Sequence, residues 1–273
     1  MITDWDRAYD NRSHVGNDVA EAFFAECAKR AQGFRDEMTA KGRAQLDLAY
    51  GQAEREKLDL FLPERTPKGL TVYIHGGFWR MFDKSFWSHL AAGALARGWA
   101  VAMPSYTLAP DVRVSHITKQ TAAAVEFAAT QIVGPVRIAG HSAGGHLASR
   151  MHCTDIPLAA QLVERTEHII SISGLSDARP LLHLALNEIF RFDEVEAAAE
   201  SPALHHPRAG ASITCWVGGA ELPEFIRQND LLANIWTGLG ATTETVHAPG
   251  KNHFTVLDDL LEPDSELNKR IAP

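Results

Sequence analysis

The sequence predicts an α/β fold, in which helices cover both faces of a mostly parallel central sheet. Two observations carry this prediction: β-favouring or apolar runs recur along the chain, and helix-like segments separate most of them. Strands are expected at 58–62, 71–74, 100–103, 136–139, 169–173, 214–217 and 243–247. Helices are expected at 86–97, 117–132, 146–153, 223–239 and 254–261. Such alternation is typical of parallel sheets enclosed by helices.

Two segments fall outside this alternation. A helix is expected over 14–40, within an N-terminal helical extension of about 1–45, because Val19, Phe23 and Cys27 lie at helical spacing. Residues 177–205 are expected to form one or two helices inserted between two strands. Each segment is either a packing layer or a roof over the site. The length of 273 residues is within the range of one larger α/β domain, so residues 1–273 are expected to form a single domain.

The composition narrows the range of partners. The net charge of −8 argues against nucleic acid, which needs clustered Lys and Arg, and against docking on an anionic membrane. No run approaches the roughly 18 apolar residues of a membrane span, and the acidic start lacks an apolar signal region. Cys27, Cys153 and Cys215 match neither a disulfide framework nor a metal-binding spacing. Reduced, buried thiols in a cytoplasmic protein are therefore expected.

The most informative motif is Gly140-His141-Ser142-Ala143-Gly144, which follows a predicted strand and precedes a predicted helix. A G-x-S-x-G pattern in this setting forms a sharp turn that exposes the serine oxygen as a nucleophile. Glycines on either side remove β-carbons that would collide with the neighbouring strand and helix. The start of the following helix offers free N–H groups to a developing oxyanion. Ser142 is therefore the candidate nucleophile.

A second loop supplies the other half of an oxyanion hole. The predicted strand 71–74 ends in His75-Gly76-Gly77-Phe78-Trp79, and a His-Gly-Gly loop in this position provides backbone N–H donors for acyl transfer. The candidate oxyanion-hole residues are Gly76, Gly77, Phe78 and Ala143. His75 is expected to hydrogen-bond the loop into shape. Phe78, Trp79 and His141 are the candidate substrate-binding residues.

A serine nucleophile needs an imidazole as base and a carboxylate that orients the imidazole. On this type of turn the chain order is serine, acid, histidine. His253 lies in the loop after the last predicted strand and is the candidate base. Glu221, at the turn after strand 214–217, is the candidate acid, and Glu224 is the alternative. His247 is expected to be structural, and His205-His206 precede the strand on the wrong side for a base.

These motifs resemble the serine-hydrolase kynurenine formamidases (arylformamidases) and related carboxylesterases of the α/β-hydrolase superfamily. The resemblance covers roughly residues 45 to 260, and the His75-Gly76-Gly77-Phe78-Trp79 loop is its most specific element. It also includes the elbow, Asn252-His253-Phe254, Tyr106-Thr107-Leu108-Ala109-Pro110, Ser173-Gly174-Leu175-Ser176-Asp177, Leu222-Pro223-Glu224-Phe225 and Gln228. The resemblance implies an α/β-hydrolase fold and hydrolysis of an N-formyl aromatic amine through a formyl-enzyme on Ser142. It places the acid at Glu221, where the formamidases usually carry aspartate.

The expected partner is a small acyl substrate, with a second copy of the chain in a homodimer as a further candidate. An esterase or thioesterase with the same three residues differs only in the pocket, so it stays open as an alternative. A catalytically silent binding module is the remaining reading, and the presence of the serine, the histidine and the loop glycines argues against it. No cofactor or metal is expected. The His-x-Gly-Thr-His motif of metal-dependent bacterial formamidases is absent.

Overall fold

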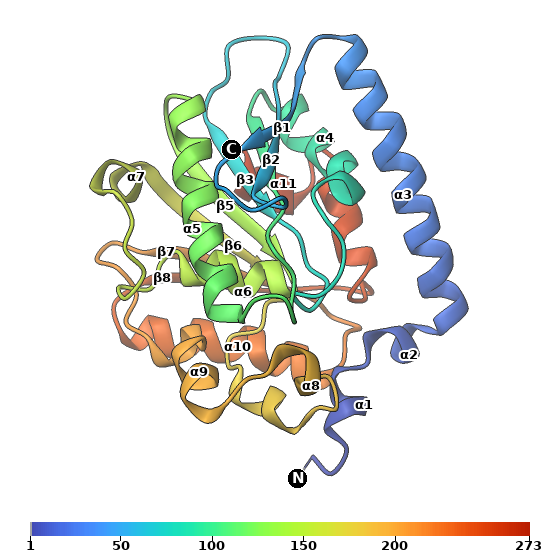
Figure 1. Cartoon of the computed structure of the whole chain (residues 1–273), viewed down its shortest axis with the longest axis vertical. Helices are drawn as coiled ribbons and strands as arrows, with labels where there is room; N and C mark the ends of the chain where they lie inside the picture. The colour runs from blue at the N-terminus through green and yellow to red at the C-terminus, as the bar shows by residue number, and fades with distance from the viewer. Residues whose placement is uncertain (1) are drawn as a thin grey trace.

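A computed structural model of the chain describes residues 2–273 (Figure 1). Within this range, eight strands form one sheet in the order β1-β2-β4-β3-β5-β6-β7-β8. The pairs β1–β2 and β2–β4 are antiparallel, and every other neighbouring pair is parallel. The strands are β1 (Ala44–Ala49), β2 (Lys57–Phe61), β3 (Leu70–Ile74), β4 (Ala100–Pro104), β5 (Val136–His141), β6 (Thr166–Ile172), β7 (Ser212–Gly218) and β8 (Thr242–Ala248).

Helices pack on both faces of this sheet, which confirms the predicted fold class. The α-helices are α1 (Trp5–Tyr9), α2 (Asn11–Val15), α3 (Asn17–Ala40), α4 (Ala92–Ala96), α5 (Val114–Gln131), α6 (Ala143–Arg150), α7 (Ala160–Arg165), α8 (Asn187–Phe190), α9 (Glu194–Ala199), α10 (Pro223–Gly238) and α11 (Glu266–Ile271). Short 3₁₀ helices span Ser85–Ala91, Arg179–His183, Pro202–Leu204 and Thr255–Leu260. None of the helices among residues 2–273 is long and apolar enough to cross a membrane.

The core lies in two layers because strand side chains alternate between the faces of the sheet. In β5, Ile138 packs into the layer that contains residues of α5, α6 and α10, whereas Ala139 packs into the layer with residues of α3, α4 and α11. Both layers are apolar, so the central strands read as nearly continuous hydrophobic runs. The three cysteines are buried and unpaired.

The first helix of the N-terminal extension and the inserted segment lie beside α10. The short helix α1 contacts α10 and the 3₁₀ helix Arg179–His183. Figure 1 shows α1, α8 and α10 at the same end of the molecule. The segment expected at 177–205 contains α8, α9 and two 3₁₀ helices. The start of the N-terminal extension and this insertion are therefore neighbours in space although more than half of the chain separates them.

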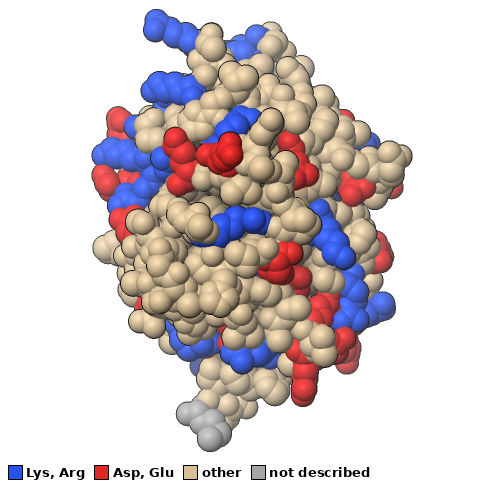
Figure 2. Space-filling view, turned by 90° about the vertical axis from the view of Figure 1, so that its left-hand side faces the viewer, with Lys and Arg blue, Asp and Glu red and all other residues tan. Residues whose placement is uncertain are grey.

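One face of the molecule carries charged side chains of both signs among many uncharged ones (Figure 2). Figure 2 shows Lys and Arg interspersed with Asp and Glu on one face of the molecule. Because opposite charges alternate on this face, the net charge of −8 is not gathered there into a patch of one sign.

Candidate active site

Ser142 sits on a strained turn between β5 and α6. Its backbone φ of 56° and ψ of −118° fall outside the regions that L-residues prefer. The Ser142 N–H donates to the carbonyl of Ile172 in the neighbouring strand β6 at 2.8 Å. The helix α6 begins at the next residue, Ala143. The serine is therefore held at a strand end, in front of a helix N-terminus, as the G-x-S-x-G pattern predicts.

Close backbone packing explains the glycines around this turn. A β-carbon on Gly140 would lie 2.0 Å from the carbonyl oxygen of Gly144. A β-carbon on Gly144 would lie 2.0 Å from the carbonyl oxygen of Ile74 in β3. Real side chains do not reach such distances, so only glycine allows α6 to start this close to the sheet.

Glu221 and His253 form a buried hydrogen-bonded pair. Their atoms Oε2 and Nδ1 are 2.6 Å apart, and both side chains are buried. The other carboxylate oxygen of Glu221 accepts hydrogen bonds from the Ser173 hydroxyl at 2.6 Å and from the Gly218 N–H at 2.8 Å. Both oxygens of the Glu221 carboxylate therefore accept a hydrogen bond. The His253 imidazole is held through Nδ1, so its Nε2 is left for other contacts.

The alternative acid, Glu224, faces a different partner. It accepts a hydrogen bond from the Tyr9 hydroxyl at 2.7 Å and pairs with Arg227 at 2.5 Å. His247 pairs with Asp230 at the surface, where its side chain is 43% exposed. Glu221 is thus the carboxylate in contact with His253, and Glu224 anchors α1 to α10.

Ser142 and His253 line the same cavity, whose volume is about 280 Å³. Its wall is mainly apolar and aromatic, which suits an organic substrate. The N-terminal helices contribute Tyr9 and Asn11, and the insertion contributes Leu184 and Leu186. The complete lining is Asp6, Tyr9, Asp10, Asn11, Arg12, Phe24, Gly76, Gly77, Phe78, Arg80, Met81, Phe82, Trp87, His141, Ser142, Leu184, Leu186, His253 and Phe254.

The loop after β3 lines this cavity with Gly76, Gly77 and Phe78. Gly77 has a φ of 114° and Phe78 a φ of 48°, both in the left-handed region. Within residues 2–273, neither of their N–H groups donates to a backbone carbonyl or a side chain. A β-carbon on Gly76 would lie 2.7 Å from the carbonyl oxygen of His141. The loop thus packs against the serine turn, so that Gly77 and Phe78 line the same cavity as Ser142.

His75 braces this loop rather than facing the cavity. Its Nδ1 lies 2.8 Å from the Gly76 carbonyl oxygen, and its ring stacks on Tyr106 with the centroids 4.5 Å apart. Burial lowers the pKa of the His75 imidazole to about 4, so the ring is neutral at pH 7 and Nδ1–H donates to Gly76. The Tyr106 hydroxyl donates to the His75 carbonyl at 3.0 Å.

Two residues expected in the substrate pocket have other contacts. Trp79 is 0% exposed and packs behind the cavity, edge-on against Phe190 of α8, so the expectation that it walls the pocket is wrong. The reason is the left-handed backbone at Phe78 and Trp79, which turns the Trp79 ring into the core. His141 does line the cavity, and its Nε2 lies 2.9 Å from the carbonyl oxygen of His253. Burial lowers the pKa of His141 well below its ordinary value, so this neutral ring donates Nε2–H to the His253 backbone.

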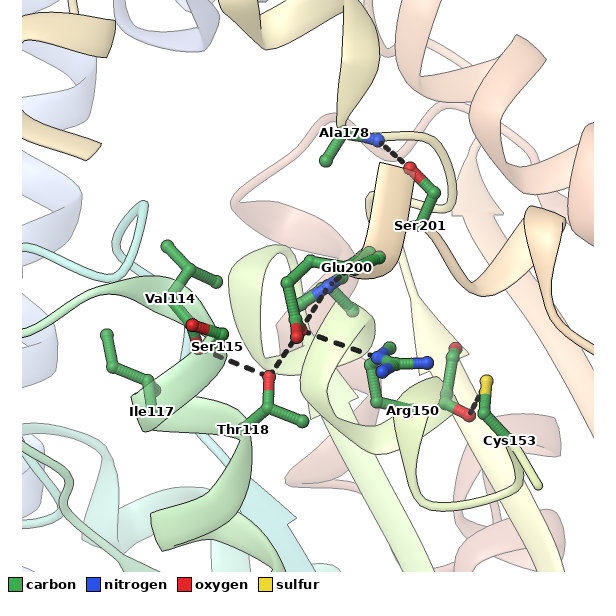
Figure 3. A network of polar contacts seen from close by, with 12 residues as sticks. Val114, Ser115, Ile117, Thr118, Arg150, Cys153, Ala178, Glu200 and Ser201 are labelled. Carbon is green, nitrogen blue, oxygen red and sulfur yellow. Dashed lines mark hydrogen bonds and ion pairs between the residues drawn. The ribbon is translucent and has the colours of Figure 1, made fainter. Parts of the chain in front are cut away.

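A buried ionic network anchors the insertion to the helix behind Ser142 (Figure 3). Glu200, which follows α9, accepts a hydrogen bond from Thr118 of α5 at 2.6 Å and lies 3.4 Å from Nε of Arg150 in α6. Arg150 also pairs with Asp155 at 2.6 Å. A buried charge needs such partners, because an unpaired one is strongly destabilising. The network therefore fixes the end of the insertion against α6, whose first residue follows Ser142.

Two residues of the N-terminal extension line the cavity but were not singled out from the sequence, which left this extension as either a packing layer or a roof. Tyr9 and Asn11 reach the cavity from α1 and α2, but the apolar periodicity that predicted a helix began only at residue 14. Tyr9 is held by a hydrogen bond to Glu224, which is distant in sequence. No local pattern signals such a contact.

Among the described residues, no group of three or more His, Cys, Asp or Glu side chains could hold a metal ion.

The fold and the glycine-flanked serine turn define an α/β hydrolase. A family model described as alpha/beta hydrolase fold matches residues 71–256, so the chain belongs to this family. Kynurenine formamidases are similar over most of the chain. The protein from Danio rerio is 28% identical over 82% of this chain and 79% of its own length. The protein from Drosophila melanogaster is 28% identical over 85% of this chain and 82% of its own length.

Solved structures agree with the fold assignment. A crystal structure described as a candidate thioesterase from a Silicibacter species is 46% identical, covers 99% of both chains and superposes with a TM-score of 0.93. Esterase B from Lactobacillus rhamnosis superposes with a TM-score of 0.67 at 17% identity, covering 92% of this chain and 91% of its own. At this lower identity, the likeness shows only the fold.

Proposed function

We propose that the chain is a serine-dependent acyl hydrolase of the arylformamidase type, which cleaves an N-formyl aromatic amine such as N-formylkynurenine. The observation that carries this proposal is the buried Glu221–His253 pair, whose histidine shares a cavity with Ser142. The similarity to kynurenine formamidases along most of their length supports the choice of substrate. The apolar and aromatic lining of the cavity suits an aromatic leaving group.

In the proposed mechanism, Ser142 Oγ attacks the formyl carbon while His253 Nε2 takes the hydroxyl proton. Glu221 keeps His253 in the tautomer that has its proton on Nδ1 and stabilises the imidazolium. Backbone N–H groups of Gly77, Phe78 and Ala143 bind the oxyanion of the tetrahedral intermediate.

The intermediate then collapses. The C–N bond breaks, His253 gives its proton to the leaving amine, and the formyl group remains as an ester on Ser142. Water attacks this ester with His253 as the base, which releases formate and restores the serine hydroxyl. No cofactor enters the proposed scheme, because proton transfer and oxyanion binding are supplied by the chain itself.

An esterase or thioesterase is the second candidate function. It is favoured by the relative described as a candidate thioesterase, which is 46% identical along the whole chain. The proposed catalytic groups are the same for both functions, since both reactions pass through an acyl-serine. Only the pocket would distinguish them.

The test compares wild type and Ser142→Ala for kcat/KM on N-formylkynurenine, on short p-nitrophenyl esters and on short acyl thioesters. The formamidase proposal predicts that N-formylkynurenine is the best substrate and that Ser142→Ala reduces turnover by a factor on the order of 10³ or more. Serine-dependent cleavage of esters or thioesters alone would favour the second candidate. Activity that survives Ser142→Ala would contradict both.

A further inference from the structure

His141 uses one of its two ring nitrogens inside the protein and leaves the other without a partner. Its Nε2 lies 2.9 Å from the carbonyl oxygen of His253, and the centroids of the two rings are 4.6 Å apart. A carbonyl oxygen carries no hydrogen, so the proton of the neutral His141 ring is on Nε2 and its Nδ1 has a free lone pair. Within residues 2–273, no backbone or side-chain donor is bonded to this Nδ1. His141 therefore has an unused hydrogen-bond acceptor.

This free nitrogen lies close to the nucleophile. A β-carbon on Gly76 would lie 3.1 Å from Nδ1 of His141 and also 3.1 Å from the β-carbon of Ser142, so these two atoms are separated by at most twice that distance. His75 and His146 each have a ring nitrogen that is closed off without a partner, whereas Nδ1 of His141 remains accessible. His141, Gly76 and Ser142 all line the cavity. The acceptor is thus within reach of a substrate bound at the serine.

The cleavage of an amide creates a need for such an acceptor. When Ser142 attacks the formyl carbon, the amide nitrogen becomes pyramidal, and its lone pair must face His253 to receive the proton. The N–H bond then points away from His253, where it has no partner unless an acceptor is present. An ester oxygen in the same position carries no hydrogen. An acceptor beside the nucleophile therefore lowers the barrier for amides and not for esters, because only amides make this bond in the transition state.

We propose that Nδ1 of His141 accepts the hydrogen bond of the scissile N–H during acylation, which makes the site selective for N-formyl amides over formyl esters. This inference rests on the proposed function, because it assigns an acceptor to the amide that the proposed reaction cleaves. No proton passes to His141. The bond between the formyl carbon and the nitrogen breaks, His253 gives its proton to the nitrogen, and the amine leaves with that hydrogen and its own.

The test compares substrates that differ only at the scissile atom. These are 4-nitroformanilide and 4-nitrophenyl formate, which would leave the same formyl group on Ser142. N-methyl-4-nitroformanilide is the third substrate: its nitrogen needs the same proton from His253 but has no N–H. The ratio of kcat/KM values between the first substrate and each of the others therefore reports on the N–H group, whereas a general loss of folding or of the base also affects the N-methyl amide.

Two substitutions separate the nitrogens of the His141 ring. In His141→Gln, the amide nitrogen can keep the bond to the His253 carbonyl, but no acceptor remains at the position of Nδ1. The kcat/KM for 4-nitroformanilide should fall at least about tenfold relative to both other substrates, as the loss of one hydrogen bond in the transition state implies. In His141→Asn, the amide oxygen can occupy the position of Nδ1, so part of the preference should remain. The kcat/KM of these variants for N-formylkynurenine should follow that for 4-nitroformanilide.

The matched control is His152→Gln. His152 is also a buried histidine whose Nε2 faces a backbone carbonyl, that of Ser212 at 3.2 Å, and it is not part of the cavity lining. Its substitution should leave the ratios as in wild type. Thermal melting checks that each variant is folded.

The outcomes distinguish this inference from the proposed function. Unchanged ratios in folded His141→Gln overturn the role of His141, and so does an equal loss on the N-methyl amide. In both cases, serine-dependent cleavage of 4-nitroformanilide or N-formylkynurenine by wild type would keep the proposed function. If wild type cleaves the ester through Ser142 but neither formamide, the proposed function is wrong, and the role of His141 is rejected with it.

Discussion

The Ser173 hydroxyl donates to Oε1 of Glu221 at 2.6 Å, while Oε2 of the same carboxylate faces His253. Ser173 is fully buried and has a φ of 51°, a conformation that serine adopts rarely. It follows β6 directly, and its own N–H is taken by the Trp216 carbonyl in β7. The strained backbone thus aims the hydroxyl at the carboxylate, and we infer that Ser173 positions Glu221.

Two substitutions of Ser173 distinguish the effect of its hydroxyl on activity from the effect of its strained backbone on stability. Ser173→Ala should lower kcat/KM about tenfold, because one oxygen of a buried carboxylate loses a donor worth about 1–3 kcal/mol. Ser173→Gly should lower activity equally but melt at a higher temperature than Ser173→Ala, since glycine tolerates a positive φ. Ser149→Ala is the control, because Ser149 is a buried serine whose hydroxyl donates only to the Gly145 carbonyl within α6. A purely structural role for Ser173 would leave kcat/KM of both variants near that of the control.

Glu221 and Glu224 should respond differently to the same substitution. Glu221→Gln is expected to reduce kcat by a factor on the order of 10²–10⁴, because the amide no longer stabilises the imidazolium of His253. Glu224→Gln should keep most activity and instead lower the free energy of unfolding, since it weakens contacts with Tyr9 and Arg227. Steady-state kinetics and urea unfolding of both variants decide the assignment. A larger kinetic loss in Glu224→Gln would exchange the two roles.

Buried neutral histidines should make the fold sensitive to acid. Burial lowers the pKa of His75 and His152 to about 4 and that of His146 to about 3, from an ordinary value of 6.5. The unfolded chain therefore takes up protons as the pH falls below about 6.5, and the folded chain does so only near pH 4. Stability is complete above pH 6.5 and falls toward pH 4, by at most about 1.4 kcal/mol per pH unit for each histidine. Glu200, whose pKa is raised by burial, opposes this trend.

Urea unfolding at about pH 7 and about pH 5 measures this loss of stability. His152→Gln should reduce the difference between the two pH values, because glutamine does not titrate and can keep the donor to the Ser212 carbonyl. Ser149→Ala, which changes a buried side chain that does not titrate in this range, should leave the difference as in wild type. Equal stability at both pH values would contradict the neutral state of the buried rings.

The sheet could be predicted well because most of its strands are enclosed. Central strands such as β5 are apolar on both faces and read as short runs between helices. The edge strand β1 was not predicted: its six residues alternate between half-buried and exposed and include Ala and Asp, which have low β-propensity. Its existence depends on pairing with β2, which is a tertiary contact.

Three residues of the candidate site could be predicted from the sequence, because the residue types that the chemistry requires occur in the expected order along the chain. Ser142, Glu221 and His253 each follow a predicted strand, and parallel strands end at one edge of a sheet. The sequence pattern does not predict the direction of side chains in the loop after β3. There, a left-handed backbone turns Trp79 away from the cavity. The sequence left open whether the N-terminal extension is a packing layer or a roof, so the position of Asn11 in the cavity lining was not predicted either.

The glycines of the serine turn should tolerate no side chain. Gly144→Ala is expected to destabilise the fold by more than about 3 kcal/mol, because its β-carbon would meet the Ile74 carbonyl oxygen at 2.0 Å and push α6 away from β3. Gly33→Ala is the matched control: Gly33 lies within α3, and a β-carbon there has no atom within 4 Å. This control should gain about 0.5–1 kcal/mol from the higher helix propensity of alanine. Urea unfolding measures both changes. If Gly144→Ala unfolds at the same urea concentration as wild type, α6 can shift without loss, and close packing is not what requires glycine behind Ser142.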